Sequence, residues 1–252
     1  MNYRRILVVG GRGGCGRSLL ASGMAASLAV RGKRVGLVDF DLWERSLDMY
    51  LGVESRVVYD LGDLLARQVT PRDVAIQYEG IKNLYLIPGA YQLRRAPTAL
   101  DVERVLGQIA GELSLDYLVI DTSHSATSLL APLVDITLVV TKADALSIRS
   151  AASVVDELRA SSMADALLVI NQMKESDGGA LRGIIDRVGI PLGGLIPLDN
   201  DLARWQERGV PLHKGTGTLF GAAVYNIAMR LTGAHVPLLE GLPLNRNKWL
   251  GR

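Results

Sequence analysis

Seven short apolar runs constrain the fold of this 252-residue chain more than any other feature of its sequence. They cover residues 4–9, 34–39, 84–88, 117–121, 137–141, 167–171 and 194–197. Strands that are buried on both faces have this composition, because neither side of the strand meets water. Segments with helical spacing lie between the runs, at residues 17–31, 99–113, 147–159, 179–188 and 219–231. The alternation predicts an α/β fold: a doubly wound, mostly parallel sheet with helices on both faces.

The composition allows this fold to form a core without disulfides or a structural metal. Hydrophobic residues make up 48% of the chain and charged residues 21%. The single cysteine, Cys15, cannot form an internal disulfide, and the N-terminus lacks the pattern of a signal peptide. No apolar run approaches the roughly 20 residues that cross a bilayer. We therefore expect a cytoplasmic protein, and the net charge of +2 does not indicate DNA binding.

A glycine-rich loop joins the first predicted strand to the first predicted helix. Residues 10–18 read Gly-Gly-Arg-Gly-Gly-Cys-Gly-Arg-Ser. Glycines let the backbone turn sharply and bring its N–H groups close to phosphate, whereas the strand and helix on either side disfavour a purely structural turn. The loop is therefore predicted to bind phosphate through Gly11, Arg12, Gly13, Gly14, Cys15, Gly16, Arg17 and Ser18.

The loop departs from the standard phosphate-binding motif at one position. That motif places a lysine before the Ser/Thr, and this chain has Arg17 there. A guanidinium can bind two phosphate oxygens at once, but it is larger than an ammonium and cannot take the same position beside the β- and γ-phosphates. We expect nucleotide binding to survive this change and hydrolysis to suffer.

The loop resembles the deviant Walker A motif of the MinD/ParA family, Gly-Lys-Gly-Gly-x-Gly-Lys-Thr. In this alignment Arg12 takes the place of the family's signature lysine, Arg17 that of the P-loop lysine, and Ser18 that of the threonine. Residues 37–41, 47–52, 56–61, 85–89 and 231–238 extend the similarity, most closely to MinD. The resemblance implies a P-loop NTPase fold of the SIMIBI, MinD-like type over residues 1–238, followed by a tail at residues 239–252.

The resemblance also implies catalytic roles for Asp41, Arg17 and Arg12, and a sensing role for Asp39. Asp41 corresponds to the aspartate that positions the attacking water, and Asp39 to the acidic residue that links the loop to the nucleotide state. Arg17 would counter the charge of the transition state. Arg12 would reach the nucleotide of the opposite subunit in a sandwich dimer, as an arginine finger does. The cofactors implied are ATP or ADP with Mg²⁺.

A Walker B pattern completes the predicted metal site. The apolar run at residues 117–121 ends in Asp121, whose carboxylate suits Mg²⁺ contacted through water. We expect Ser18, Asp39 and Asp121 to hold the metal. Relatives continue with Thr-Pro-Ala-Gly, whereas residues 122–125 here are Thr-Ser-His-Ser. This change casts doubt on sensing of the γ-phosphate.

Two further segments resemble the family's base-binding loops. Asn171 ends a predicted strand, and its amide can donate to and accept from adenine at the same time. Pro197 and Asp199 match a second loop that contacts the base. An ordinary polar cap at the end of a strand is the alternative interpretation of Asn171.

These observations support two functions. The first is an ATP-dependent switch that closes a homodimer, binds a regulatory protein and organises a cell-division site or a cargo, with slow ATP hydrolysis. The second is a non-hydrolysing scaffold that resembles the CpaE/TadZ pilus localisation factors. An iron–sulfur reductase would need paired cysteines, which the chain lacks. Cations and Trp249 in residues 243–252 suggest a weak peripheral contact with the inner membrane surface.

Overall fold

The computed structural model describes residues 3–42, 44–161, 165–202, 205, 209–211, 213–242, 244 and 249–250. Within them a single sheet has the strand order β3-β4-β2-β5-β1-β6-β7-β8. Neighbouring strands run parallel except for the pair β3–β4, which is antiparallel. The strands are β1 (Arg4–Gly10), β2 (Val35–Asp39), β3 (Ile76–Gln77), β4 (Leu84–Ile87), β5 (Tyr117–Thr122), β6 (Ile136–Lys142), β7 (Asp165–Met173) and β8 (Leu192–Pro197). The predicted doubly wound, mostly parallel sheet is confirmed.

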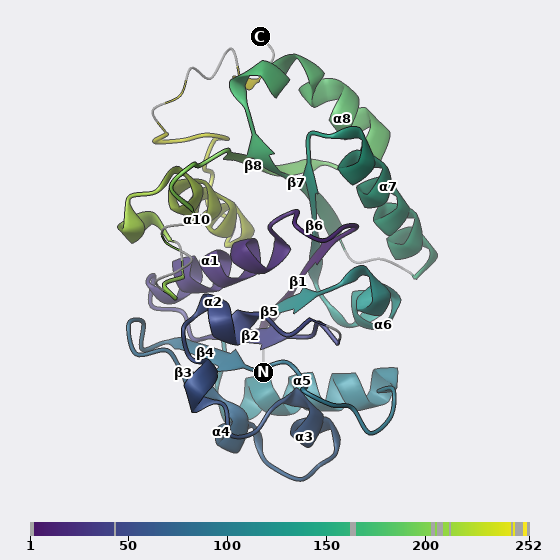
Figure 1. The fold of residues 1–252 in the computed structure, drawn as a ribbon, viewed down its shortest axis with the longest axis vertical. Coiled ribbons are helices and arrows are strands. Elements are labelled where there is room, and N and C mark those ends of the chain that lie inside the picture. Colours follow the sequence, from purple (N-terminus) through teal and green to yellow (C-terminus); the bar gives the residue numbers. More distant parts are fainter. Residues whose placement is uncertain are drawn as a thin grey trace.

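Helices cover both faces of the sheet, as Figure 1 shows. On one face α1 (Arg17–Ala29) packs against α10 (Leu219–Leu231). The other face carries a row in which each helix contacts the next: α5 (Ala99–Glu112), α6 (Thr127–Leu130), α7 (Ala145–Ala160) and α8 (Leu181–Val188). Three short helices, α2 (Leu47–Tyr50), α3 (Leu61–Leu65) and α4 (Pro71–Val74), lie between β2 and β3 in the chain.

The start of α5 illustrates how local chemistry sets the element boundaries. Thr98 Oγ1 accepts a hydrogen bond from the Asp101 N–H at 3.2 Å, and Asp101 accepts one from the Thr98 N–H at 3.1 Å. Each side chain therefore satisfies a backbone donor that the first turn of the helix leaves unpaired. α1 differs, because its first residue follows Gly16 and no side chain caps it.

The chain beyond α10 folds back onto the domain. Asn226 Nδ2 donates to the Glu240 carbonyl at 2.7 Å, and the side chains of Leu239, Leu242 and Trp249 are buried. The division between residues 1–238 and a tail at 239–252 stays a prediction, and residues 243, 245–248 and 251–252 lie outside the described residues. None of the helices in the described part of the chain has the length and apolar character needed to span a membrane.

The parallel sheet brings polar residues together at the carboxyl ends of its strands. Asp39, at the end of β2, pairs in register with Asp121 near the end of β5. β1 lies beside β5 and leads directly into the glycine loop. Because all these strands run in the same direction, the loop and both aspartates meet at one edge of the sheet.

Candidate functional site

The glycine loop forms an anion-binding turn at the start of α1. Gly14 has φ +72° and Gly16 has φ +88°, a left-handed conformation that glycine adopts without steric cost. Gly16, the residue before α1, provides no side-chain cap, so the N–H groups of the first turn of the helix face the loop. N–H groups in this arrangement, at the positive end of a helix dipole, favour a phosphate.

A cleft of about 460 Å³ opens beside the loop. The predicted residues that line it are Arg12, Gly13, Gly14, Cys15, Gly16, Arg17, Ser18, Asn171 and Asp199. Leu198, which lies in the predicted base-contacting loop between Pro197 and Asp199, lines it as well. Sequence reasoning missed Leu19, Glu44, Ser46, Tyr50, Gln172, Asn200 and Leu202, which also line it. Two residues predicted to bind the nucleotide do not line the cleft: Gly11 packs against the α7 backbone at Ser150, and Pro197 is buried at the end of β8. The residues predicted for catalysis or for the metal that do not line it either are Asp39, Asp41 and Asp121.

Arg17 lines the cleft, and its guanidinium contacts two carboxylates. Its Nε lies 2.8 Å from Asp121 Oδ1, and its Nη2 lies 2.6 Å from Asp41 Oδ2. The side chains of Arg17, Asp41 and Asp121 are 14%, 3% and 0% exposed. Burial lowers the pKa of Arg17, but Asp121 and Asp41 outweigh it and raise the pKa above its usual value, so the guanidinium stays charged. Arg17 thus neutralises the carboxylates of the predicted Walker B residue and of the predicted water-positioning residue.

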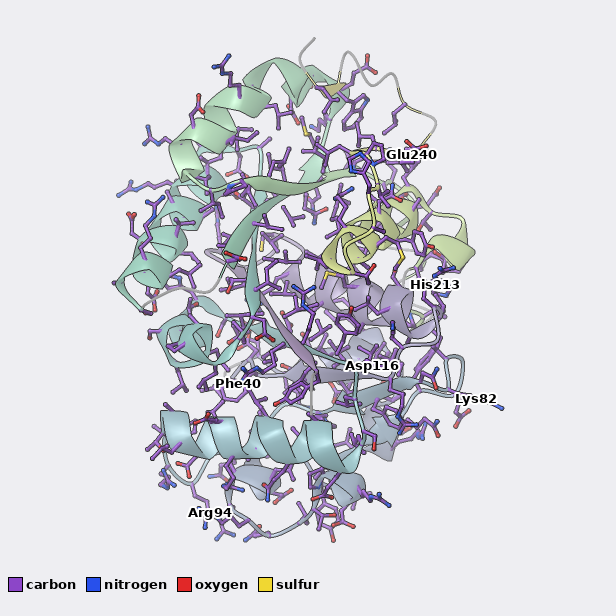
Figure 2. The ribbon with its side chains drawn as sticks, turned by 180° about the vertical axis from the view of Figure 1, so that it is seen from behind. Phe40, Lys82, Arg94, Asp116, His213 and Glu240 are labelled. Carbon is purple, nitrogen blue, oxygen red and sulfur yellow. The ribbon has the colours of Figure 1, made fainter. Side chains whose placement is uncertain are left out.

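Asp39 organises the chain that follows β2. Its Oδ1 accepts the Asp41 N–H at 3.1 Å, and its Oδ2 accepts the N–H groups of Ser46 and Leu47 at 2.9 and 3.0 Å. Phe40, fully buried among residues of α5 on the opposite side, anchors the segment (Figure 2). Burial and the nearby charge of Asp121 raise the pKa of Asp39 to about 7.

The raised pKa of Asp39 predicts that its contribution to stability falls with rising pH. The unfolded chain releases this proton near 3.8, whereas the folded chain holds it up to about 7. Between these values the folded chain binds more protons, so the stability is complete below 3.8 and declines toward 7. Relative to Asp39→Asn, we expect the wild-type free energy of unfolding to fall by about 1.4 kcal/mol per pH unit in this window. Urea denaturation at several pH values checks this, and parallel curves for the two proteins would contradict it.

The residues predicted to hold Mg²⁺ do not fit that ion in this arrangement. Both oxygens of Asp39 accept backbone N–H groups, and Asp121 Oδ1 is bound to Arg17. Asp121 Oδ2 is buried without a hydrogen-bond partner, and the Ser18 side chain lies close enough to this carboxylate to oppose the rise in its pKa. Mg²⁺ requires a nearly octahedral set of oxygen ligands, and the guanidinium adds a like charge beside it. Across the described residues, no group of three or more His, Cys, Asp or Glu side chains could hold a metal ion.

Asn171 braces the glycine loop. Its Nδ2 donates to the Cys15 carbonyl at 2.8 Å, and its Oδ1 accepts the Gln172 N–H at 2.8 Å. A Cβ added at Gly16 would clash with this amide, so the loop and Asn171 fit closely together. These contacts make Asn171 a positioning residue, and its predicted contact with adenine stays a prediction.

Asp199 positions the start of α10 through hydrogen bonds to backbone N–H groups. Its Oδ2 accepts the Phe220 N–H at 3.1 Å, and its Oδ1 accepts the Asp201 N–H at 3.1 Å. The carboxylate therefore ties the segment after β8 to the first turn of α10 while it also borders the cleft. Its predicted contact with the base is likewise a prediction.

The altered segment after Asp121 is tied to α7. His124 Nε2 lies 3.2 Å from Glu157 Oε2, and the hydroxyls of Ser123 and Ser125 are 3.0 Å apart. His124 is not among the residues that line the cleft, and its contact is with a helix of the opposite face. This geometry gives His124 a contact that ties the segment after β5 to α7.

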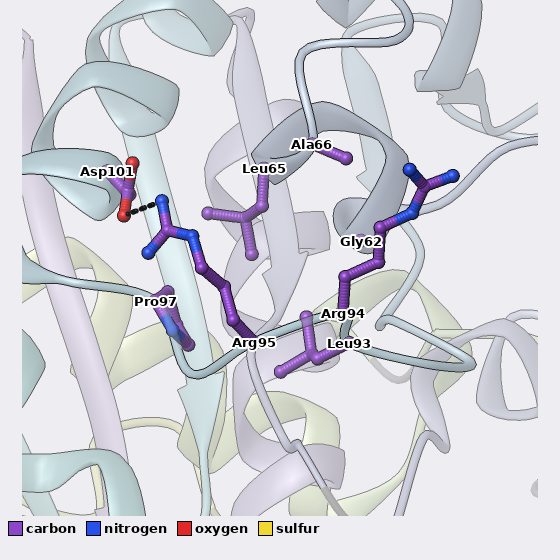
Figure 3. Close-up of a pocket in the computed structure, with 8 residues that line it drawn as sticks. All are labelled: Gly62, Leu65, Ala66, Leu93, Arg94, Arg95, Pro97 and Asp101. Carbon is purple, nitrogen blue, oxygen red and sulfur yellow. Dashed lines mark ion pairs between the residues drawn. The ribbon is translucent and has the colours of Figure 1, made fainter.

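A second hollow, of about 300 Å³, shares no lining residue with the cleft. Leu65, Leu93 and Pro97 give it apolar walls, and Arg95 at its edge is paired with Asp101 at 2.8 Å (Figure 3). None of the residues predicted to bind a ligand lies in it. The cleft beside the glycine loop is therefore the candidate site.

Comparison with known proteins agrees with this geometry. The profile of one family, described as ParA, NUBPL iron-transfer P-loop NTPase, matches residues 2–232. A septum site-determining protein MinD from Synechocystis is 29% identical over 94% of this chain and 92% of its own length. A putative septum site-determining protein MinD from Oltmannsiellopsis viridis is 31% identical over 91% of this chain and 76% of its own length.

Solved structures give the same picture of the fold. A MinC:MinD cell division complex from Aquifex aeolicus superposes with a TM-score of 0.84 at 26% identity, covering 93% of this chain and 98% of the other. MinD from Pyrococcus horikoshii in complex with Mg-ADP superposes with a TM-score of 0.77 at 23% identity, covering 91% and 96%. The glycine loop thus lies in a fold that other proteins use to bind a nucleotide.

Proposed function

Because the chain belongs to the ParA family of P-loop NTPases, we propose that it binds ATP or ADP in the cleft and acts as a nucleotide-dependent switch in spatial organisation of the cell. The observation that carries this proposal is the glycine loop, which places the first turn of α1 beside a cleft of about 460 Å³. Its relatives include septum site-determining proteins, which favours a role at the cell-division site or in positioning a cargo.

Nucleotide binding closes a homodimer in this proposal. Arg12 is exposed at the rim of the cleft, where a second subunit can meet it. It would reach the partner's nucleotide and compensate phosphate charge across the interface. The complex of MinC with MinD in a similar structure supports a regulatory protein as a further partner. The protein would work in the cytoplasm, with the tail making at most a peripheral contact with the inner membrane.

Hydrolysis is slow in this proposal because Asp41 is occupied. The 2.6 Å contact between Arg17 and Asp41 holds the carboxylate that would orient the attacking water. The same contact favours a second candidate function, a scaffold that binds nucleotide without hydrolysing it. Iron transfer is disfavoured, because the only cysteine, Cys15, is buried and its pKa is raised by that burial.

Nucleotide binding and phosphate release separate these functions. Calorimetry with ATP and ADP should register binding, and light scattering should show a dimer with ATP. Arg17→Lys should raise phosphate release by about tenfold, because a lysine lacks the two separate nitrogens with which Arg17 contacts Asp41 and Asp121. Asp41→Ala in that background should remove the gain.

Three outcomes would count against the switch. Binding without phosphate release in both the wild type and Arg17→Lys would favour the scaffold. Equal release from Arg17→Lys with and without Asp41→Ala would exclude Asp41 as the water-positioning residue. Absence of binding to either nucleotide would overturn the proposed function itself.

A further inference from the structure

Arg17, which lines the cleft, supplies a positive charge to two buried carboxylates behind it. One edge of its guanidinium serves two different side chains, with Nε 2.8 Å from Asp121 and Nη2 2.6 Å from Asp41. These partners lie 104 and 24 residues away in the sequence, so the fold assembles the contact. Removing either partner of an ion pair this buried leaves an uncompensated charge inside the protein, which is strongly destabilising.

We propose that Arg17 is a built-in counter-cation that takes over the charge-neutralising role of Mg²⁺, so that this cleft binds nucleotide without a divalent cation. The inference rests on the proposed function as a nucleotide-binding protein. It concerns the metal requirement of the site, which neither the family nor the fold decides for a chain with arginine at this position.

The surroundings of Arg17 leave a metal ion little to bind. Both carboxylate oxygens of Asp39 accept hydrogen bonds, from the N–H groups of Asp41, Ser46 and Leu47. Asp121 has one unpartnered oxygen, in a fully buried side chain whose other oxygen is held by the guanidinium. Mg²⁺ would have to displace Arg17, and the displaced guanidinium would lose both of its short ion pairs.

The loop retains other means of holding polyphosphate. The first turn of α1 and the exposed side chain of Arg12 lie on the cleft. Arg17 lowers the cost of bringing an anion near Asp41 and Asp121, because the cluster no longer repels it with two uncompensated charges. Phosphate then meets backbone dipoles and Arg12 in place of a metal ion.

Magnesium alone provides the first test, and it needs no nucleotide. Thermal unfolding of the full chain is measured in EDTA and in saturating MgCl₂. The wild type should shift by less than about 1 °C, because its carboxylates are already paired. Arg17→Ala and Arg17→Lys should each be stabilised by about 2–4 °C, because Asp121 and Asp41 become available to the ion.

Arg45→Ala is the matched control. Arg45 Nη2 pairs with the buried carboxylate of Asp48 at 2.7 Å, so this variant also leaves a buried aspartate without its arginine. In Arg45→Ala, Asp41 and Asp121 still contact Arg17. Mg²⁺ should therefore shift the melting temperature of this variant no more than that of the wild type. Stabilisation of the wild type by Mg²⁺ as large as that of Arg17→Lys would overturn the inference, and so would equal stabilisation of Arg45→Ala.

The second test measures affinity for ATP with and without Mg²⁺. The wild-type dissociation constant should differ by less than about threefold between EDTA and MgCl₂, whereas that of Arg17→Lys should differ by more than about tenfold. A wild type that needs Mg²⁺ as strongly as Arg17→Lys would overturn the inference and leave the proposed function intact. A wild type that binds no nucleotide would overturn the proposed function, while the experiment with Mg²⁺ alone would still decide whether Arg17 excludes the metal.

Discussion

Replacing Arg17 by alanine is expected to lower the free energy of unfolding by about 3–5 kcal/mol in metal-free buffer near neutral pH. The substitution leaves Asp41 and Asp121, which are 3% and 0% exposed, without the cation that both of them contact. This loss of stability comes from the buried carboxylate charge that Arg17→Ala leaves uncompensated. The attraction within the intact ion pair does little more than offset the hydration that its groups lose on burial. Urea denaturation in EDTA measures the difference directly.

The pH dependence of this loss identifies its cause. Burial raises the pKa of Asp121 even in the wild type, and Arg17 is the main influence that lowers it again. In Arg17→Ala this lowering disappears, so protonation can relieve the charge as the pH falls. The deficit relative to the wild type should therefore shrink as the pH falls below neutrality.

A surface pair provides the control for Arg17→Ala. Arg5 Nη2 lies 3.8 Å from Asp135 Oδ1, and these side chains are 28% and 40% exposed. Arg5→Ala should cost less than about 1 kcal/mol, because water screens an exposed pair. If Arg17→Ala cost no more than Arg5→Ala, the two short contacts of Arg17 would not persist in solution, and the explanation for slow hydrolysis would be lost with them.

The sheet and its main helices could be predicted from sequence because burial on both faces leaves continuous apolar runs. Each of the seven predicted strands is found, with ends that differ by a few residues. β3 was missed, because two residues carry no pattern and its antiparallel pairing depends on β4. α2, α3, α4 and α6 have four or five residues each, too few to show the helical period.

The place where the predicted site residues meet could also be predicted from sequence, but the contacts among their side chains could not. Residues at the ends of parallel strands and in the loop after β1 had to meet at one edge of the sheet, and they do. The direction of Arg17 was open, because a guanidinium can face phosphate or carboxylate equally well. Tyr50 and Gln172 were missed as residues of the cleft; Tyr50 lies in a run that resembles MinD, whereas Gln172 has only its position after Asn171 to mark it.

Gly16→Ala is expected to cost about 2–5 kcal/mol of stability and to abolish nucleotide binding. Gly16 has φ +88°, which alone disfavours a Cβ, and the added methyl would clash with Asn171 Nδ2. That amide is held in place by its 2.8 Å hydrogen bond to the Cys15 carbonyl, so it cannot move away without releasing the loop. The substitution must distort the turn that presents the first N–H groups of α1. The one added methyl group therefore lowers both the stability and the affinity for the ligand.

Gly14→Ala separates the two causes. Gly14 has φ +72°, but a Cβ there would meet nothing within 4 Å. It should therefore carry only the cost of the left-handed backbone, about 1–2 kcal/mol, while Gly16→Ala adds the clash. A double-mutant cycle of Gly16→Ala with Asn171→Ala should show coupling of about 1–3 kcal/mol, because removing the amide relieves the clash. Equal losses for the two glycine variants, with no coupling to Asn171, would show that the amide does not fix the shape of the loop.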